Sequence, residues 1–207
     1  MVFARAPIPG QTKTRLIPAL GEAGAARLHA EMIYQSLEKA TALRNVEAEL
    51  WCTPDTNHRF FVSCADTYEV QLRQQSGSDL GERMRNAFAA SPDRSPGVIL
   101  IGSDCPELTV NDLKRTMRIL HNEAEVVLGP ATDGGYVLIA LRRPVPDLFA
   151  DMPWGSDQVA ELTRGRLRDL GMRWRELPAR NDIDRPGDLV HLDIVIRGSV
   201  SELQRRL

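Results

Sequence analysis

The stretch Val98-Ile99-Leu100-Ile101-Gly102-Ser103-Asp104-Cys105-Pro106 decides the fold prediction for this chain. Its first four residues are apolar and lie between two glycines, which is typical of a strand buried on both faces of a parallel sheet. Such a strand needs helices on either side, so the stretch predicts a central strand of an α/β domain. Ser103 and Asp104 then lie at its carboxyl end, where α/β sheets bind their ligands.

Asp104 has two open interpretations at this point. A carboxylate held by a tight turn can coordinate a divalent cation through its oxygen atoms. It can equally cap a turn or the helix that follows. The other segments of the chain favour the ligand.

The composition limits the classes of protein to consider. The chain has 207 residues, room for one large α/β domain. Its 26 Lys+Arg nearly balance its 28 Asp+Glu, and no basic run is long enough to suggest nucleic-acid binding. None of Cys52, Cys64 and Cys105 forms a CxxC motif, and the four histidines are scattered, so no zinc-type spacing is present. No apolar run approaches the roughly 18 residues of a membrane span. We expect a soluble cytoplasmic protein without nucleic-acid or membrane partners; a homodimer is left open.

Apolar periodicity and turn signals predict alternating strands and helices. The predicted strands are Met1 to Ala6, Glu47 to Cys52, Tyr68 to Arg73, residues 98–102, Val126 to Gly129, Tyr136 to Leu141 and Arg173 to Leu177. The first two predicted helices are Ala23 to Leu43, after a loop closed by Pro18 and Gly21, and His58 to Cys64. Three more are predicted from their caps: one capped by Ser78 or Asp79 and ending near Ala90, one capped by Thr109 and Asp112 and ending near Asn122, and one capped by Ser156 and ending near Gly171. The last predicted helix begins at Pro186, with Leu189 and Leu192 on its inner face.

The segment 130–135 breaks the alternation of strand and helix. It has only six residues, too few for a crossover helix, so the strands on either side of it cannot be parallel neighbours. The sequence therefore predicts an α/β fold in three layers with a mixed, mostly parallel sheet. No repeat, low-complexity segment or linker interrupts it, and we interpret residues 1–207 as a single domain.

A polar loop carrying two cations follows the first predicted strand. Pro9 and Gly10 end that strand, and Lys13 and Arg15 follow at once. Their charge and hydrogen-bond geometry suit phosphate oxygens. The spacing fits neither the P-loop nor the GxGxxG fingerprint. Ordinary surface cations on a solvated loop are the alternative interpretation.

Four acidic residues at predicted loop positions are candidates for metal binding: Asp104, Asp133, Asp182 and Asp184. If the sheet gathers them, two or three can hold Mg²⁺ or Mn²⁺ while the cations of the first loop hold phosphates. The alternative for each acid is turn chemistry or capping, and it is strongest for Asp133, which precedes two glycines. Trp154 can stack on a base or sugar, although a single tryptophan more often packs against the protein. No GxSxG motif supports a nucleophilic triad.

Six segments together resemble one bacterial family. They are PIPGQTKTRLIPALG (residues 7–21), SDLGERM (78–84), GSDCPELT (102–109), GPATDGGYVLIAL (129–141), PWGS (153–156) and NDIDRPGDL (181–189). That family belongs to the GT-A, nucleotide-diphospho-sugar-transferase superfamily and is commonly labelled glycosyltransferase, with some members associated with arsenosugar biosynthesis. More distantly, the chain is similar to the phospholactate and molybdenum-cofactor nucleotidyltransferases.

The resemblance implies roles for several residues. Lys13 and Arg15 would contact the phosphates of a nucleotide donor, and Asp104 would bind the metal after the central strand. Asp184, rather than Asp182, would be the second metal ligand. The chain lacks the Asp-x-Asp usual in glycosyltransferases of this fold, because Cys105 and Pro106 follow Asp104. It also lacks the Gly-Gly-x-Gly-x-Arg loop of the molybdenum-cofactor nucleotidyltransferases.

Three functional hypotheses follow. The first is glycosyl transfer from a nucleotide-sugar to a small acceptor, with Asp133 as a candidate base. The resemblance slightly favours this hypothesis. The second is nucleotidyl transfer from an NTP to a phosphorylated or alcoholic acceptor with release of pyrophosphate. The third is nucleotide binding without catalysis. The expected site comprises catalytic Asp104 and Asp133; nucleotide-binding Pro9, Gly10, Lys13, Arg15, Asp79 and Ser103; pocket residues Gly134, Gly135, Trp154, Gly155 and Ser156; and metal-binding Asp104, Asp184 and Asp182.

Overall fold

A seven-stranded sheet forms the centre of the computed structural model, which describes residues 1–91 and 95–192. The strands lie in the order β3-β2-β1-β4-β6-β5-β7, and β6 alone runs antiparallel to its neighbours. Their bounds are Val2–Arg5 (β1), Glu49–Thr53 (β2), Gln71–Gln74 (β3), Val98–Gly102 (β4), Val126–Pro130 (β5), Tyr136–Leu141 (β6) and Trp174–Glu176 (β7).

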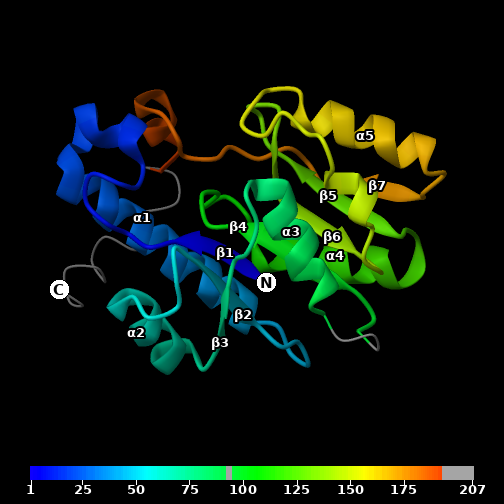
Figure 1. Cartoon of the computed structure of the whole chain (residues 1–207), viewed down its shortest axis with the longest axis horizontal. Helices are drawn as coiled ribbons and strands as arrows, with labels where there is room; N and C mark the ends of the chain where they lie inside the picture. Colours follow the sequence, from blue (N-terminus) through cyan, green and yellow to red (C-terminus); the bar gives the residue numbers. More distant parts are fainter. Residues whose placement is uncertain (92–94, 193–207) are drawn as a thin grey trace.

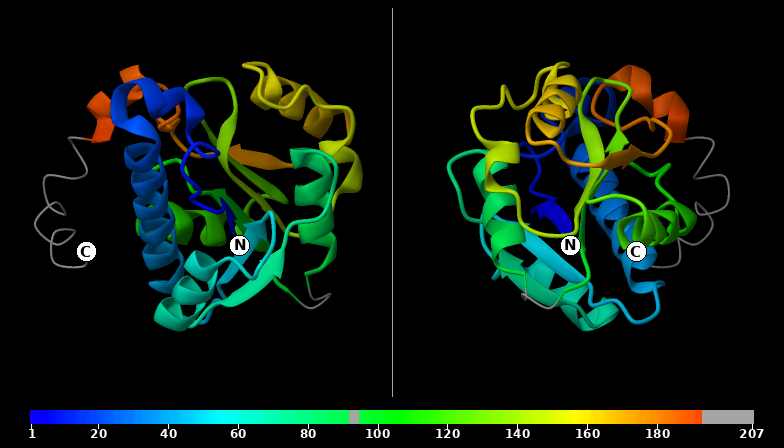
Figure 2. Two further views of the ribbon diagram at one scale, coloured as in Figure 1. Left: turned by 60° about the vertical axis from the view of Figure 1, so that its left-hand side comes forward. Right: turned by 90° about the vertical axis from the view of Figure 1, so that its right-hand side faces the viewer.

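Helices cover both faces of this sheet and make three layers (Figure 1 and Figure 2). The α-helices are Ile17–Thr41 (α1), Arg59–Tyr68 (α2), Leu80–Ala89 (α3), Val110–Asn122 (α4) and Val159–Asp169 (α5), and the short 3₁₀ helices are Thr14–Leu16 (η1), Pro146–Phe149 (η2) and Pro186–His191 (η3). Side chains from α1, α2 and α4 pack in one core cluster, and those from α3, α5 and η2 in another. In the left view of Figure 2 the sheet lies between α1 and α3.

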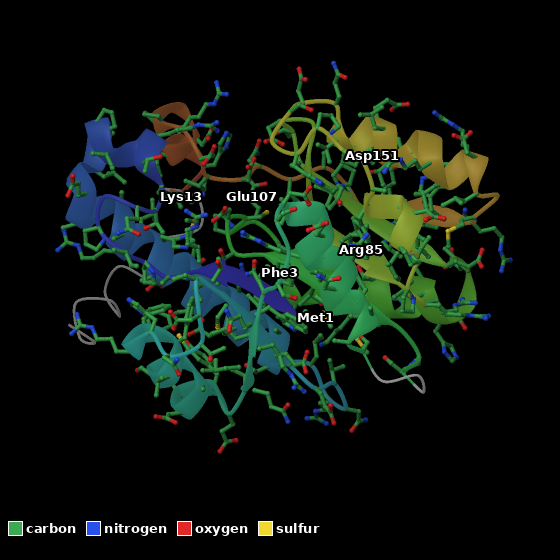
Figure 3. All side chains as sticks on the ribbon, viewed as in Figure 1. Met1, Phe3, Lys13, Arg85, Glu107 and Asp151 are labelled. Atoms are coloured by element: carbon green, nitrogen blue, oxygen red, sulfur yellow. The ribbon has the colours of Figure 1, made fainter. Side chains whose placement is uncertain are left out.

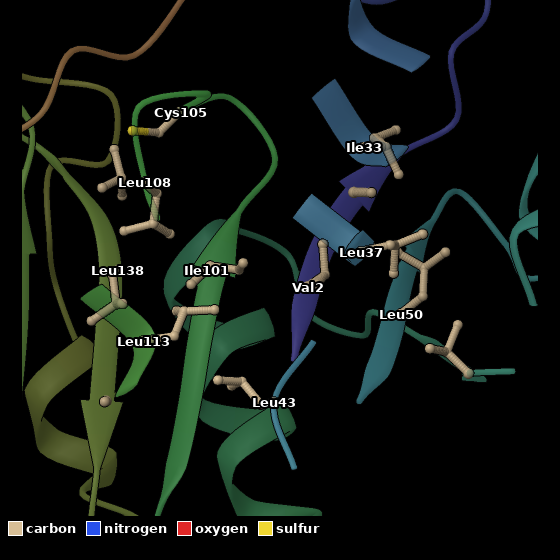
Figure 4. Close-up of a cluster of buried hydrophobic side chains, with 14 of the residues drawn as sticks. Val2, Ile33, Leu37, Leu43, Leu50, Ile101, Cys105, Leu108, Leu113 and Leu138 are labelled. Atoms are coloured by element: carbon tan, nitrogen blue, oxygen red, sulfur yellow. The ribbon is translucent and has the colours of Figure 1, made fainter. Parts of the chain in front are cut away.

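The larger core cluster lies under α1, α2 and α4. Figure 4 shows Val2 of β1 and Leu50 of β2 on the side of Leu37 of α1, and Ile101 of β4 beside Leu113 of α4. Each of these side chains is buried. Burying an aliphatic side chain of this size contributes roughly 1.5–3 kcal/mol, so the packing of α1 and α4 on the strands β1, β2 and β4 stabilises the central part of the sheet.

The central strand confirms the main prediction from the sequence. β4 spans the expected residues and lies in the middle of the sheet, between β1 and β6. Leu100 and Ile101 are buried, but Val98 and Ile99 are only partly so, and the expectation of complete burial on both faces is wrong for the start of the strand. β5 and β6 pair antiparallel, as their short connection requires.

Helix α4 begins as its sequence predicts. The Thr109 hydroxyl accepts a hydrogen bond from the Asp112 amide at 3.1 Å, and the Asp112 carboxylate accepts one from the Thr109 amide at 3.0 Å. This capping box satisfies amides that would otherwise lack a partner in the first turn. Asp79 caps α3 with a single bond of this kind, in which its Oδ1 accepts from the Glu82 amide at 2.8 Å.

Several predicted boundaries are wrong. The α-helix α1 begins at Ile17, directly after η1, so Pro18 lies inside its first turn. Gly21 (φ 69°) then interrupts α1, and the predicted start at Ala23 fits the part after that glycine. Tyr68 ends α2 and does not begin a strand, because its ring packs 6.2 Å from that of Tyr34 on α1. Ser156 does not cap α5, which starts at Val159.

Candidate functional site

The site lies where the chain turns to opposite sides of the sheet. β1 continues toward β2 on one side and has β4 on the other, and ligands of α/β proteins bind at such switch points, outside the carboxyl ends of the strands. Residues 178–184 cross over the end of β4 toward η3 (Figure 1). The Ile183 amide donates to the Asp104 carbonyl at 2.8 Å, so the crossing segment is attached directly to the end of the central strand.

Lys13 is the centre of the charged cluster. Its Nζ lies 3.1 Å from Oδ1 of Asp104, 3.7 Å from Oδ1 of Asp184 and 2.5 Å from the carbonyl oxygen of Ile183. The Lys13 side chain is only 4% exposed, whereas those of Asp104 and Asp184 are 45% and 38% exposed. Figure 3 shows Lys13 and Glu107 at this edge of the sheet, next to the orange segment that leads to η3. The ammonium group therefore lies beneath two carboxylates that face solvent.

Arg15 adds a second cation on the outside of the same cluster. Its Nη1 donates to Oδ2 of Asp184, the carboxylate oxygen that Lys13 does not contact. The Arg15 side chain is largely exposed. Two carboxylates and two cations from three distant segments thus meet at one place.

His29 closes the cluster from the side of α1. Its ring is buried, with Nε2 3.0 Å from the Arg5 carbonyl oxygen and Nδ1 3.6 Å from Oδ1 of Asp104. Because a carbonyl can only accept, Nε2 carries the proton of the first contact. Nδ1 has no hydrogen-bond partner and lies next to the Asp104 carboxylate. The histidine therefore links the end of β1 to Asp104.

The pKa of Asp104 is lowered well below its usual value. Partial burial of the carboxyl group on its own would raise this pKa, but the charge of Lys13 and the contacts with His29 together outweigh that effect. The carboxylate is therefore ionised at any physiological pH, which is the form that accepts hydrogen bonds or binds a cation.

Asp182 behaves in the opposite way. Burial and the neighbouring Asp133 carboxylate raise its pKa to about 6, with Lys13 acting weakly in the other direction. At this pKa the carboxyl group of Asp182 can exchange a proton close to neutral pH, unlike that of Asp104.

Hydrogen bonds from two neighbouring loops hold the segment that carries Asp182 and Asp184. The Asn181 amide and side-chain nitrogens each donate to the Glu107 carboxylate at 3.0 Å. Thr132 donates to the Asn181 side-chain oxygen at 2.9 Å. Arg180 reaches the α4 cap residue Asp112 at 3.0 Å. The position of Asp184 is thus fixed by contacts with the loops after β4 and β5.

Asp133 and the two following glycines form a tight turn. Oδ1 of Asp133 accepts from the Gly135 amide at 2.9 Å, as the turn interpretation predicts. Gly134 has φ 92°, and a β-carbon at this position would lie 2.0 Å from the Asp157 carbonyl oxygen. Only glycine fits there, so the turn packs directly against the loop before α5.

Trp154 packs onto the first turn of α3. A β-carbon at Gly81 would lie 2.5 Å from the indole nitrogen of Trp154, so the glycine admits the ring against the first turn of α3. Tyr136 meets the same indole edge-on, with the ring centres 6.3 Å apart. These contacts fit the packing interpretation of Trp154.

The other predicted site residues have more local surroundings. Ser103 is buried, with its hydroxyl 3.4 Å from Oδ1 of Asp104, and Gly10 lies in the loop that leads to Lys13. Pro9 is exposed, and the space that a β-carbon of Gly155 would occupy is open. Ser156 accepts a bond from the Gln158 amide at 3.4 Å. Roles for these residues in binding a nucleotide stay predictions.

The sequence prediction missed His29, the Ile183 carbonyl and Asn181. His29 gave one usable signal, because it lies three and four positions before Met32 and Ile33 and so shares their buried face. A polar residue on such a face needs a partner. No sequence signal indicates which main-chain carbonyl a folded loop directs at a lysine.

Oxygen atoms of Asp104, Asp184 and Ile183 are the donors that Mg²⁺ and Mn²⁺ prefer, and all three converge on one nitrogen. They fit a divalent cation. Within residues 1–91 and 95–192, no group of three or more His, Cys, Asp or Glu side chains is placed to hold a metal. A cation here would complete its coordination with water and substrate oxygens, as Mg²⁺ usually does. None of the described helices has the length and hydrophobicity needed to cross a membrane.

Solved structures and a curated relative resemble this chain over most of its length. A structure from Desulfovibrio desulfuricans G20, provisionally named a nucleotide-diphospho-sugar transferase, superimposes with a TM-score of 0.85 at 29% identity and covers 96% of this chain and 87% of its own. A cytidylyltransferase from Leptospira borgpetersenii shares the fold, with a TM-score of 0.63 at 16% identity over 96% of this chain and 86% of its own. The 3-phospho-D-glycerate guanylyltransferase of Phenylobacterium zucineum is 26% identical over 87% of this chain and 83% of its own length.

These comparisons establish the fold of the nucleotide-diphospho-sugar transferases, a mixed and mostly parallel sheet between helices. A family model matches residues 36–156, which is more than half of the chain. The chain belongs to the bacterial family described as "Uncharacterized protein conserved in bacteria (DUF2064)".

Proposed function

We propose that this protein is a metal-dependent nucleotidyltransferase. An oxygen atom of a small acceptor attacks the α-phosphorus of a nucleoside triphosphate, a new P–O bond forms, and the bond to the bridging oxygen breaks to release pyrophosphate. The relative from Phenylobacterium zucineum, named for guanylyl transfer to 3-phospho-D-glycerate, favours this reaction over glycosyl transfer.

One observation carries the proposal. Asp104 and Asp184, which lie far apart in the sequence, both have a carboxylate oxygen within 4 Å of the Lys13 ammonium, and Arg15 contacts the second of them. Acids that can hold a cation thus lie beside cations that can hold phosphates. A triphosphate matches this arrangement, because its oxygens bind divalent cations and basic side chains at the same time.

Asp104 and Asp184 would hold Mg²⁺ or Mn²⁺, with the Ile183 carbonyl as a further oxygen donor. When bound, this metal neutralises charge on the phosphates. The Arg15 guanidinium can bind a phosphate bidentately, and the amides of Arg180, Asn181 and Ile183 are already engaged by the Pro130 carbonyl, Glu107 and the Asp104 carbonyl. We therefore assign donor binding to side chains of the loop after β1.

The acceptor would lie on the side of Asp133 and the loop before α5. A phosphorylated acceptor needs no base, because its attacking oxygen is already anionic. An alcoholic acceptor must lose a proton, and the two carboxylates on that side, Asp133 and Asp182, are the candidates to receive it. A phosphorylated acceptor thus requires no catalytic base from the site.

Glycosyl transfer remains the second candidate, supported by the name of the Desulfovibrio structure at 29% identity. The two reactions differ in their leaving groups. Nucleotidyl transfer releases pyrophosphate from an NTP, whereas glycosyl transfer releases a nucleoside diphosphate from a nucleotide-sugar.

A thermal-shift panel of the four NTPs and common nucleotide-sugars, each with Mg²⁺, Mn²⁺ or a chelator, identifies the donor. A ligand at about 100 times its dissociation constant adds roughly 2.7 kcal/mol of apparent stability. The selected donor is then incubated with phosphorylated acceptors, 3-phosphoglycerate first, and the released product is measured. We expect pyrophosphate in the presence of metal, no release by Asp104→Asn, and unchanged release by Lys114→Met, an exposed lysine on α4.

Release of nucleoside diphosphate from a nucleotide-sugar, without pyrophosphate from any NTP, would reject the proposal in favour of glycosyl transfer. Nucleotide binding without turnover of any acceptor would favour a protein that binds and does not catalyse.

A further inference from the structure

Lys13 occupies an unusual place for a residue expected to bind phosphate. Its side chain is 4% exposed, whereas the two carboxylates beside it are 45% and 38% exposed. Its backbone has φ 48°, in the left-handed region that residues with a β-carbon seldom adopt. The fold therefore accepts a local cost to hold this ammonium group between the acids.

The three oxygen atoms around Nζ are the three that suit a divalent cation. They come from Asp104, Asp184 and Ile183, at 3.1, 3.7 and 2.5 Å. An ammonium group and a divalent cation cannot share this position, because both need the same lone pairs and their charges repel each other. Binding of the metal thus requires the lysine to leave.

We propose that the Lys13 ammonium is the resident cation of the site in the free protein, and that a divalent metal enters by displacing it toward the donor phosphates. The phosphate destination rests on the proposed function; the competition between lysine and metal does not. In the free protein, Lys13 and Arg15 balance the charges of Asp104 and Asp184. When a metal with two charges takes their place beside the acids, both cations become available to an anionic ligand.

The exchange couples metal binding to nucleotide binding. Without nucleotide, the metal must displace an ammonium group that has no other anionic partner, so the metal binds weakly. With a triphosphate present, the displaced ammonium gains phosphate oxygens, so each ligand favours the other. The protein would therefore select the metal–nucleotide complex over free metal.

Mn²⁺ binding without nucleotide tests the competition directly, for example by the electron paramagnetic resonance signal of free Mn²⁺. Lys13→Met keeps the length of the side chain and removes its charge, and Lys13→Gln gives a second, polar replacement. We expect both to bind Mn²⁺ at least about tenfold more tightly than the wild type, in the range of effects of groups that surround metal ligands. Adding Asp104→Asn to Lys13→Met should abolish the gain.

Lys114→Met is the matched control, since it removes the same charge from an exposed position on α4. It should leave the Mn²⁺ affinity at the wild-type value. If it tightens Mn²⁺ binding as much as Lys13→Met does, the gain reflects net charge and the exchange is rejected. Equal Mn²⁺ affinities of wild type and both folded Lys13 variants reject it as well.

Acetylation of the wild-type protein gives an independent test if the variants do not fold. With acetic anhydride and peptide mass spectrometry, Lys13 should be protected relative to Lys114 in the free protein, and excess Mn²⁺ should increase its acetylation. Unchanged acetylation of Lys13 in excess Mn²⁺ overturns the proposal. Because neither test contains nucleotide, failure to release pyrophosphate bears only on the proposed function.

Discussion

Two charged clusters in this protein are built in opposite ways. Between α5 and β7, Arg164 meets Glu176 through two parallel hydrogen bonds of 2.8 and 2.9 Å, and the two side chains are covered almost equally, with 27% and 29% exposed. Trp174 adds a third donor to the same carboxylate at 3.3 Å. In the Lys13 cluster the cation is buried and its carboxylates face solvent.

The difference separates an ion pair that holds elements together from one that is available to a ligand. In the Arg164 pair the guanidinium geometry matches the carboxylate, so both oxygens are engaged. An ammonium group is a point charge that two carboxylates share at longer distances, which leaves carboxylate oxygens open on the side of solvent. The first arrangement should matter for stability and the second for binding.

The largest expected effect is that of Asp104→Ala on turnover. The variant should fold, because the side chain is half exposed and the bond from the Ile183 amide uses the main-chain oxygen. Metal-dependent nucleotide binding should be lost, and kcat should fall by about 10²–10³, the range for one preorganised electrostatic group. Circular dichroism and pyrophosphate release measure the two quantities. Metal-assisted binding at the wild-type level would remove Asp104 from the site.

Lys13→Ala and Arg15→Ala should each weaken the affinity for an NTP by about 1.5–3 kcal/mol, the range for hydrogen bonds to charged groups. Isothermal titration with the matching nucleoside is the control, because a group that binds phosphate does not affect a ligand without phosphate. If nucleoside and nucleotide lose affinity equally, the loop shapes the pocket and does not bind the phosphates.

Arg164→Ala should lower the free energy of unfolding by about 1–2 kcal/mol, since the pair is partly exposed and bonded twice. Arg164 holds the pKa of Glu176 below its usual value. A lowered pKa means that the pair stabilises the protein above the unfolded value near pH 4.3 and loses this effect as the pH falls through the folded value. Thermal melts of variant and wild type should therefore converge in acid. Nucleotide affinity should not change. If Arg164→Ala lost as much nucleotide affinity as Lys13→Ala, the two clusters would not differ in function as described.

Arg168→Ala should have the smallest effect. Its guanidinium makes one contact with Glu161, at 3.3 Å, and the side chain is largely exposed. Exposed pairs of this kind contribute about 0.2–1 kcal/mol, so the stability should lie within roughly 0.5 kcal/mol of the wild type by chemical denaturation. A loss as large as that of Arg164→Ala would mean that geometry does not distinguish the two arginines.

Local sequence signals predicted the parts of this fold that are determined locally. The apolar run of β4 and the Thr109–Asp112 cap depend on neighbouring residues, and both occur where expected. The prediction that a strand begins at Tyr68 was wrong. Aromatic residues favour strands in general, but here the Tyr68 ring packs against α1. The prediction that Ser156 caps α5 was wrong because the close contact between Gly134 and Asp157 keeps the segment of Ser156 in a loop.

The same distinction applies to the candidate site. The order of strands and helices placed Asp104 at a carboxyl end, and charge selected Lys13, Arg15 and Asp184 as candidates; the structure brings these four together. The sequence could not indicate that Lys13 lies between the acids, because that depends on the path of a segment about 170 positions away. The roles of all these residues stay predictions until they are tested.

The hydrogen bond from the Ile183 amide to the Asp104 carbonyl makes one amide proton a reporter for the whole site. The bond joins the two segments that carry the acids, and the Ile183 side chain is fully buried. Solvent deuterium can replace this proton only when the segments separate. The exchange rate of a single residue therefore measures how often the cation site comes apart, and a ligand that holds the acids together will slow that exchange by the ratio of bound to free protein.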